Sequence, residues 1–134
     1  MLDPIAEMLT SIRNAQRAGK KAVIIHASNL KFAIAKILEK EGFVESVNKE
    51  KINNHEKITV GLKYYVVSNT KKIPAIKELK RISKQGQRIY LKNKEIKNVK
   101  NNFGIAVVST SKGIMTHAEA KKSGLGGEYI CEVW

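Results

Sequence analysis

The sequence predicts an α+β fold of two small subdomains. Helical periodicity fills much of the first forty residues, strict apolar–polar alternation follows around residue 60, and the last thirty residues contain short apolar runs separated by glycine and polar residues. The order α-β-α-β-β implies helices on one face of a small mixed sheet in the first part. The second part reads as mainly β with a short helix. A chain of 134 residues suffices for one domain or two very small ones. We expect an N-terminal subdomain over 1–67, a linker over 68–74 and a C-terminal subdomain over 75–134.

The first helix is predicted from its start signal and its apolar stripe. Asp3 can cap the helix, and Pro4 suits the first turn, where no N–H is needed. Apolar residues then recur at helical spacing, and Gly19 can end the helix. This stripe consists of Ile5, Met8, Leu9 and Ile12.

A strand, a second helix and two further strands are expected next. Residues 22–27 read as a short buried strand, and Ser28 or Asn29 can cap a helix that ends at Gly42. We expect residues 43–51 to form a strand, with a turn at 53–54 before a half-buried strand that continues to residue 67. The inward residues of the second helix are expected to be Leu30, Ala33, Ile34, Ile37 and Leu38.

Residues 68–101 are harder to assign. The segment 68–74 is polar, basic and ends in proline, as linkers often do. Apolar residues then recur every third position from 73 to 82, which favours a helix, yet residues 87–91 resemble a strand and a hairpin through 84–86 is also possible. Residues 95–101 are expected to form a helical turn.

The C-terminal segment has a clearer pattern. We expect a strand over 105–109, a polar loop over 109–113, a helix and a final strand over 128–134. Thr116 and Glu119 have the spacing of a capping box, and Gly124 can end the helix.

The charge of the chain indicates a polyanionic partner. The formal net charge is +13, and residues 71–100 contain 11 basic side chains against two acidic ones, Glu78 and Glu95. A field of this sign attracts nucleic acid. A membrane partner is disfavoured, since the basic segment lacks an apolar interfacial face and no apolar run approaches the ~20 residues of a membrane span. We also expect no secretory signal and no internal disulfide, because Cys131 is the single cysteine.

Catalysis and metal binding are poorly supported. The three histidines are scattered, Cys131 lies in an apolar strand pattern, and no Cys/His spacing suggests zinc. The Gly-Leu-Gly-Gly run from Gly124 lacks the Lys-Ser/Thr of a phosphate-binding loop. We therefore predict neither an enzyme nor a cofactor.

Nucleic-acid binding fits two clusters better. Short hydroxyl side chains, a lysine and a glycine at 109–113 would allow close approach to a ribose, a phosphate or a base edge. Arg88 and Tyr90 alternate on one strand and would share a face, where a ring can stack on a base. The alternative is that the polar loop is only a capped turn and that Tyr90 is core. The loop residues are Ser109, Thr110, Ser111, Lys112 and Gly113.

These residues resemble a known family. The runs STSKG at 109–113 and GLGGE at 124–128, with Val133-Trp134, resemble the C-terminal signature of small-subunit ribosomal protein eight. Residues 3–14 resemble that family's opening helix and residues 80–90 its middle block, so the similarity covers the whole chain. Gln85 departs from the pattern, because a proline usually stands there.

The resemblance implies a structural ribosomal protein that binds the central domain of 16S rRNA, supports assembly and is monomeric when free. It also resolves residues 76–83 towards strand. The resemblance further implies a cytoplasmic ribosome, ribosomal protein five as a neighbour and, in many members, repression of the chain's own operon mRNA. A translational repressor or basic RNA chaperone outside the ribosome is the alternative function. The polar loop, Gly126, Gly127, Glu128, Arg88 and Tyr90 match the main RNA contact, and Thr10, Arg13, Asn14 and Lys31 match contacts to a second RNA segment.

Overall fold

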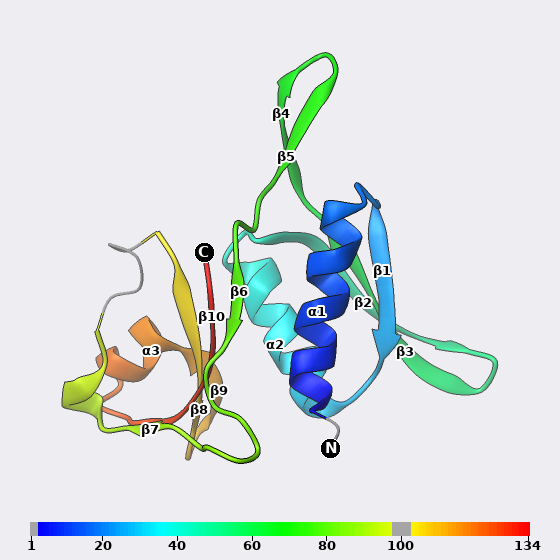
Figure 1. Cartoon of the computed structure of the whole chain (residues 1–134). Coiled ribbons are helices and arrows are strands. Elements are labelled where there is room, and N and C mark those ends of the chain that lie inside the picture. The colour runs from blue at the N-terminus through cyan, green and yellow to red at the C-terminus, as the bar shows by residue number, and fades with distance from the viewer. Residues whose placement is uncertain (1–2, 98–102) are drawn as a thin grey trace. The chain divides into compact units, whose positions relative to one another are not determined.

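The computed structural model describes residues 3–97 and 103–134 and has the predicted α+β class (Figure 1). By their contacts the residues form two compact units. The N-terminal unit is Glu7–Lys77, and the C-terminal unit is Glu78–Trp134 with the residues up to Ala6. None of the helices in the described ranges is long and apolar enough to cross a membrane.

The N-terminal unit is a helical layer on an antiparallel sheet. Strand β3 lies between β1 and β2 and is antiparallel to both. The expected mixed sheet is therefore wrong: β1 and β2 run parallel to each other, as a crossover through α2 requires, but β3 is inserted between them. Figure 1 shows both helices on one face of this sheet. The elements are α1 (Pro4–Arg17), β1 (Ala22–His26), α2 (Asn29–Lys40), β2 (Val44–Ile52) and β3 (His55–Leu62).

The core of this unit follows the predicted periodicities. Ile58, Val60 and Leu62 are buried on β3, whereas the residues between them are not. On α2 the stripe is shifted slightly, since Leu30 is 40% exposed and Ala35 is fully buried. The helical residues that complete the core are Met8, Leu9, Ile12, Ala15, Ile34, Ile37 and Leu38.

Start and stop signals act as predicted in both helices. Asp3 Oδ1 accepts from the Ile5 and Ala6 amides, and Ser28 accepts from the Lys31 amide. The two-residue turn between β2 and β3 has positive φ at Asn53 (52°) and Asn54 (67°), a conformation that asparagine tolerates and that matches the twist of a hairpin.

The expected linker is instead half of a hairpin. Strand β4 (Tyr64–Ser68) pairs with β5 (Lys71–Pro74) in a separate two-stranded sheet. The β-branched and aromatic residues of β4 favour a strand, and they supply a pairing partner for the polar residues that follow. Polar composition at 68–74 therefore reflects exposure, not absence of structure.

The C-terminal unit is a sheet centred on β10 (Gly127–Val133), with strand order β6-β10-β8-β9 and all pairs antiparallel. Strand β7 (Tyr90–Leu91) also pairs with β10. The other strands and helices are β6 (Leu79–Arg81), η1 (Asn93–Glu95), β8 (Ile105–Thr110), β9 (Gly113–Thr116) and α3 (His117–Lys122).

Four details differ from or refine the expectations in this unit. Residues 79–81 are a strand, as the resemblance implied. The expected strand over 87–91 shrinks to two residues, because Lys84 and Gln87 exchange two backbone hydrogen bonds and make the tight hairpin that was the alternative. The helical turn occupies Asn93–Glu95, and the rest of the turn expected at 95–101 lies largely outside the described residues. Strand β9 was not predicted. It has only four residues, begins with a glycine and ends on a helix cap, so it shows no clear alternation of apolar and polar residues.

Candidate nucleic-acid interface

The register of the C-terminal sheet brings three distant segments together. On β10, Glu128 lies opposite Tyr90 of β7 on one side and opposite Ser109 of β8 on the other. Residues directly opposite each other in antiparallel strands present their side chains to the same face. Tyr90, Glu128 and Ser109 therefore form one row across the end of the sheet, although 38 positions separate the first two in sequence.

The polar loop at 109–113 is a tight hairpin between β8 and β9. Thr110 pairs with Gly113, and the Thr110 hydroxyl donates to the Gly113 carbonyl at 2.8 Å while it accepts from the Lys112 amide at 3.1 Å. Gly113 has φ of +116°, a conformation that side chains disfavour. The hydroxyl of Thr110 thus holds the turn, and Ser111 and Lys112 remain exposed at its tip.

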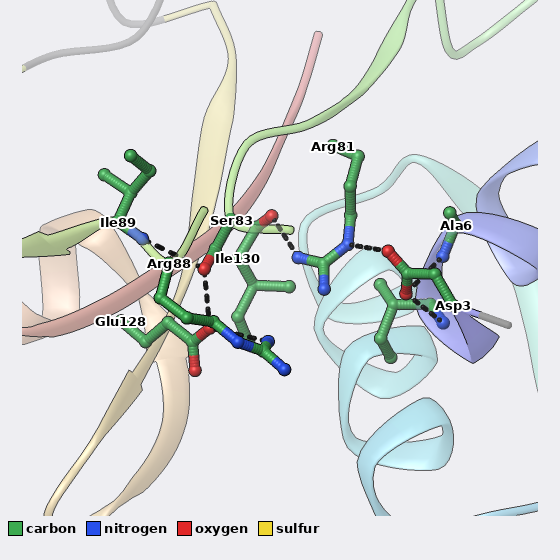
Figure 2. A network of polar contacts seen from close by, with 9 residues as sticks. Asp3, Ala6, Arg81, Ser83, Arg88, Ile89, Glu128 and Ile130 are labelled. Carbon is green, nitrogen blue, oxygen red and sulfur yellow. Dashed lines mark hydrogen bonds and ion pairs between the residues drawn. The ribbon is translucent and has the colours of Figure 1, made fainter. Parts of the chain in front are cut away.

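A buried serine connects the row to Arg88 (Figure 2). The Ser83 hydroxyl donates to Glu128 Oε2 at 2.6 Å and accepts from the Ile89 amide at 3.1 Å. The same Oε2 accepts from Arg88 at 3.1 Å. Glu128 therefore anchors Arg88, whose side chain is 46% exposed and can still reach a ligand. Ser83 itself is fully buried, and sequence reasoning missed it because a lone serine carries no periodic signal.

A second arginine is fixed beside this network. Arg81 Nε contacts Asp3 Oδ2 at 3.2 Å, and its NH1 donates to the Ile130 carbonyl at 2.7 Å (Figure 2). Burial raises the pKa of Asp3, but hydrogen bonds from Ala6, Arg81 and Ile5 and the arginine charge outweigh it and hold that pKa below its usual value. A shallow hollow of about 140 Å³ lies alongside, lined by Asp3, Pro4, Arg81, Gln85 and Arg88.

Gly126 and Gly127 are glycines for reasons internal to the unit. A Cβ on Gly126 would overlap the Leu91 carbonyl oxygen, and a Cβ on Gly127 would overlap the carbonyl oxygen of Ser109. These two glycines let β7 and β8 approach β10 closely. The lack of a side chain at these two positions is therefore required by the packing of the sheet itself.

Other residues weighed in the sequence occupy clear structural positions. Tyr90 is 67% exposed, which excludes the alternative that it is core. Cys131 is fully buried. Burial raises its thiol pKa to about 12; the charge of Glu132 also raises this pKa, whereas the charge of Arg81 lowers it. The ring of His117 is buried and accepts from the Ala106 amide. Among the residues that the structure describes, no cluster of His, Cys, Asp and Glu could hold a metal ion.

The predicted N-terminal site residues lie in the other unit. Thr10 and Asn14 are exposed one turn apart on α1, and Arg13 beside them is half-buried. Lys31 donates to the His26 carbonyl and lines a hollow of about 130 Å³ with Glu7, Ser11 and residues of β1. Neither Thr10, Arg13 nor Asn14 lines that hollow, so these residues share a unit without forming one pocket.

Comparison with known proteins accounts for the whole chain. The family described as Ribosomal protein S8 matches residues 3–134. The chain is 51% identical over its full length to the small ribosomal subunit protein uS8 of Caldanaerobacter subterraneus, covering 98% of that relative. It is 47% identical to uS8 of Neisseria meningitidis and 44% identical to uS8 of Cupriavidus metallidurans, with 99% of this chain and 98% of each relative covered. The chain therefore belongs to the ribosomal protein S8 family, a non-enzymatic family of small-subunit proteins involved in translation.

Proposed function

We propose that the chain is built into the small ribosomal subunit, where it binds the central domain of 16S rRNA and supports assembly at the cytoplasmic ribosome. The observation that carries this proposal is the row of Tyr90, Glu128 and Ser109, which three separate segments bring together across the end of the sheet. A shared row of aromatic, acceptor and hydroxyl groups suits an irregular RNA surface with unstacked bases.

The groups in and around the row would contact different parts of the RNA. Tyr90 exposes a ring on which a splayed base can stack. Ser111 and Lys112 at the hairpin tip offer a hydroxyl and a charge, and Arg88 offers guanidinium donors for phosphate. Glu128 would repel phosphate, so we assign it to holding Arg88 and to accepting from a ribose hydroxyl or a base amino group. The hairpin residues Ser109, Thr110 and Gly113, with Gly126 and Gly127, shape this surface.

The remaining predicted contacts form a second, smaller area of the proposal. Thr10, Arg13, Asn14 and Lys31 would meet another RNA segment through the N-terminal unit. We assign principal RNA binding to the C-terminal unit because that unit holds the row and the exposed hairpin tip beside it, and because residues 78–100 contain eight basic side chains against two acidic ones. Contacts to phosphates through both units would position the protein, and the row would read local structure.

Filter binding of the full chain to the cognate rRNA hairpin tests this function. We expect a clear preference over an arbitrary hairpin of equal length at moderate salt, because a purely electrostatic interaction discriminates poorly between RNAs. Equal affinity for both hairpins would refute specific recognition. Gradient sedimentation addresses the alternative function: a cellular pool found wholly outside small subunits would favour a free repressor or chaperone.

A further inference from the structure

The β4–β5 hairpin is the most apolar exposed surface of the described chain. Among residues 3–97 and 103–134, eight large hydrophobic side chains are strongly exposed, and four of them lie on these two short strands. Val66 is 73% exposed, the largest fraction of these four. The RNA-binding row does not use this hairpin, so its exposed surface needs a separate explanation. The four residues are Tyr65, Val66, Val67 and Ile73.

The two outer edges of the hairpin differ in chemistry. Strand β5 begins with Lys71 and Lys72 and ends at Pro74, features that discourage a further strand from pairing. Strand β4 has neither charge nor proline over Tyr64–Ser68, and no described strand pairs with its outer edge. Proteins usually protect such an edge because its free N–H and C=O groups are a template for another chain. The outer edge of β4 is therefore the one edge of this hairpin that can accept a further strand.

The base of the hairpin is held in place. The Tyr64 hydroxyl donates to the Lys20 carbonyl at 2.6 Å, and the Ala75 amide donates to the Lys63 carbonyl at 2.9 Å. Lys63 also lies over the Tyr65 ring, 5.7 Å from its centre. These contacts fix where the hairpin projects from the rest of the N-terminal unit (Figure 1). A pre-ordered strand loses less conformational entropy when a partner binds.

We propose that the outer edge of β4 docks an extended, acidic segment of another protein, which adds as a third strand to the hairpin. Main-chain hydrogen bonds would give the affinity, and apolar side chains of the segment would cover Val66 and Val67. The charge favours an acidic partner: residues 57–77 contain five lysines and no acidic side chain. This interaction is independent of the RNA-binding row.

The aliphatic character of the surface favours protein over RNA. RNA-binding surfaces use aromatic or guanidinium planes for stacking and cations for phosphate. Val66, Val67 and Ile73 offer none of these groups, and their branched side chains pack best on another pleated strand. Tyr65 and the nearby lysines alone would have fitted either partner.

A photo-crosslinker identifies the class of the occupant in the intact assembly. The full chain with benzoylphenylalanine in place of Val66 is incorporated into small subunits and irradiated. We expect a protein adduct whose crosslinked peptide is rich in Asp, Glu and apolar residues. An adduct with rRNA alone, or no adduct in subunits that contain the chain, would overturn the proposal.

Charge substitution then tests the edge itself. In subunits purified with the double variant Val66→Glu, Val67→Glu, we expect occupancy by the crosslinked partner to fall at least roughly tenfold, since charged side chains on an edge oppose strand addition and carboxylates repel an acidic segment. The matched control is Phe103→Glu, which adds a carboxylate at another strongly exposed apolar site and should leave occupancy unchanged. Filter binding of the double variant to the rRNA hairpin should be retained, which separates this proposal from RNA recognition. Unchanged occupancy in the double variant, or a free chain that dimerises with its β4 amides protected from hydrogen exchange, would contradict an acidic partner strand.

Discussion

The Ser83 hydroxyl lies 2.6 Å from Glu128 Oε2, which joins residues 45 positions apart across the C-terminal sheet. Ser83 also accepts from the Ile89 amide, so one buried hydroxyl fixes both the carboxylate and the segment leading to β7. Because Glu128 in turn accepts from Arg88, the position of an exposed guanidinium depends on a side chain that no RNA could touch. Ser83 is thus a positioning residue for the proposed interface.

Ser83→Ala should lower both stability and RNA affinity. The substitution leaves the Ile89 amide and one Glu128 oxygen without their buried partner, at a cost of about 1–3 kcal/mol in the free energy of unfolding. Denaturant unfolding measures this loss, and filter binding at a temperature where the variant is fully folded measures affinity. Ser68→Ala, at an exposed serine, is the control. Wild-type affinity in folded Ser83→Ala would show that Arg88 does not need this network.

Gly127→Ala should destabilise the fold before it affects RNA. The added methyl would overlap the Ser109 carbonyl oxygen, a backbone atom that moves only with its strand. Forced overpacking of this kind costs roughly 1–3 kcal/mol. Gly86→Ala is the matched control, because nothing lies within 4 Å of a Cβ there. Equal thermal unfolding temperatures for Gly127→Ala and Gly86→Ala would show that β10 and β8 can accommodate the added methyl group, contrary to this expectation.

Element types proved more predictable than the contacts of particular residues. Capping residues, the turn at 53–54 and the alternation on β3 are local signals, and each gave the right element. A strand was expected over residues 64–67, but β5 and its pairing with β4 were missed because an exposed strand lacks a buried face. The inserted position of β3 was missed because pairing order is a non-local property. At the candidate site, the residue types and the charge were visible in the sequence, whereas the exposure of Tyr90 was left open. The pairing of Glu128 with Tyr90 and Ser109, and the role of Ser83, depend on register.

The charge of Asp3 should make stability fall in acid. Its folded pKa lies below the ordinary value of an aspartate, so in acid the unfolded state binds more protons than the folded state. The contribution is therefore fully present above about pH 4 and is lost as pH falls through the folded pKa. Asp3→Asn keeps a good helix cap but removes this charge. We expect its unfolding free energy to differ most from wild type near pH 6.

The measurement is urea unfolding of both proteins across pH 3–6. The curves should converge towards the acid end, as the wild-type carboxyl becomes protonated and comes to resemble the amide in charge. Arg81→Gln tests the same pair from the other side and should also flatten the profile, since the guanidinium contributes to the low pKa of Asp3. Parallel wild-type and Asp3→Asn curves over this range would mean that the Asp3–Arg81 contact adds no pH-dependent stability.

Two substitutions should distinguish residues that recognise the local structure of the RNA from residues that contact its phosphates. Ser111 is exposed at the tip of the β8–β9 hairpin, and its loss would leave a group on the RNA unpaired, which costs about 1–3 kcal/mol for the cognate hairpin. Lys77 is exposed and lies outside the row, so Lys77→Ala should weaken the binding of all RNAs about equally.

The salt dependence of binding distinguishes Ser111→Ala from Lys77→Ala further. The slope of log K against log salt should become shallower by at most roughly 0.7–0.9 for Lys77→Ala, the value of one phosphate contact, and stay unchanged for Ser111→Ala. If both variants lost affinity evenly across RNAs with the same slope, the hairpin tip would contribute only non-specific binding, and recognition would have to come from elsewhere in the chain.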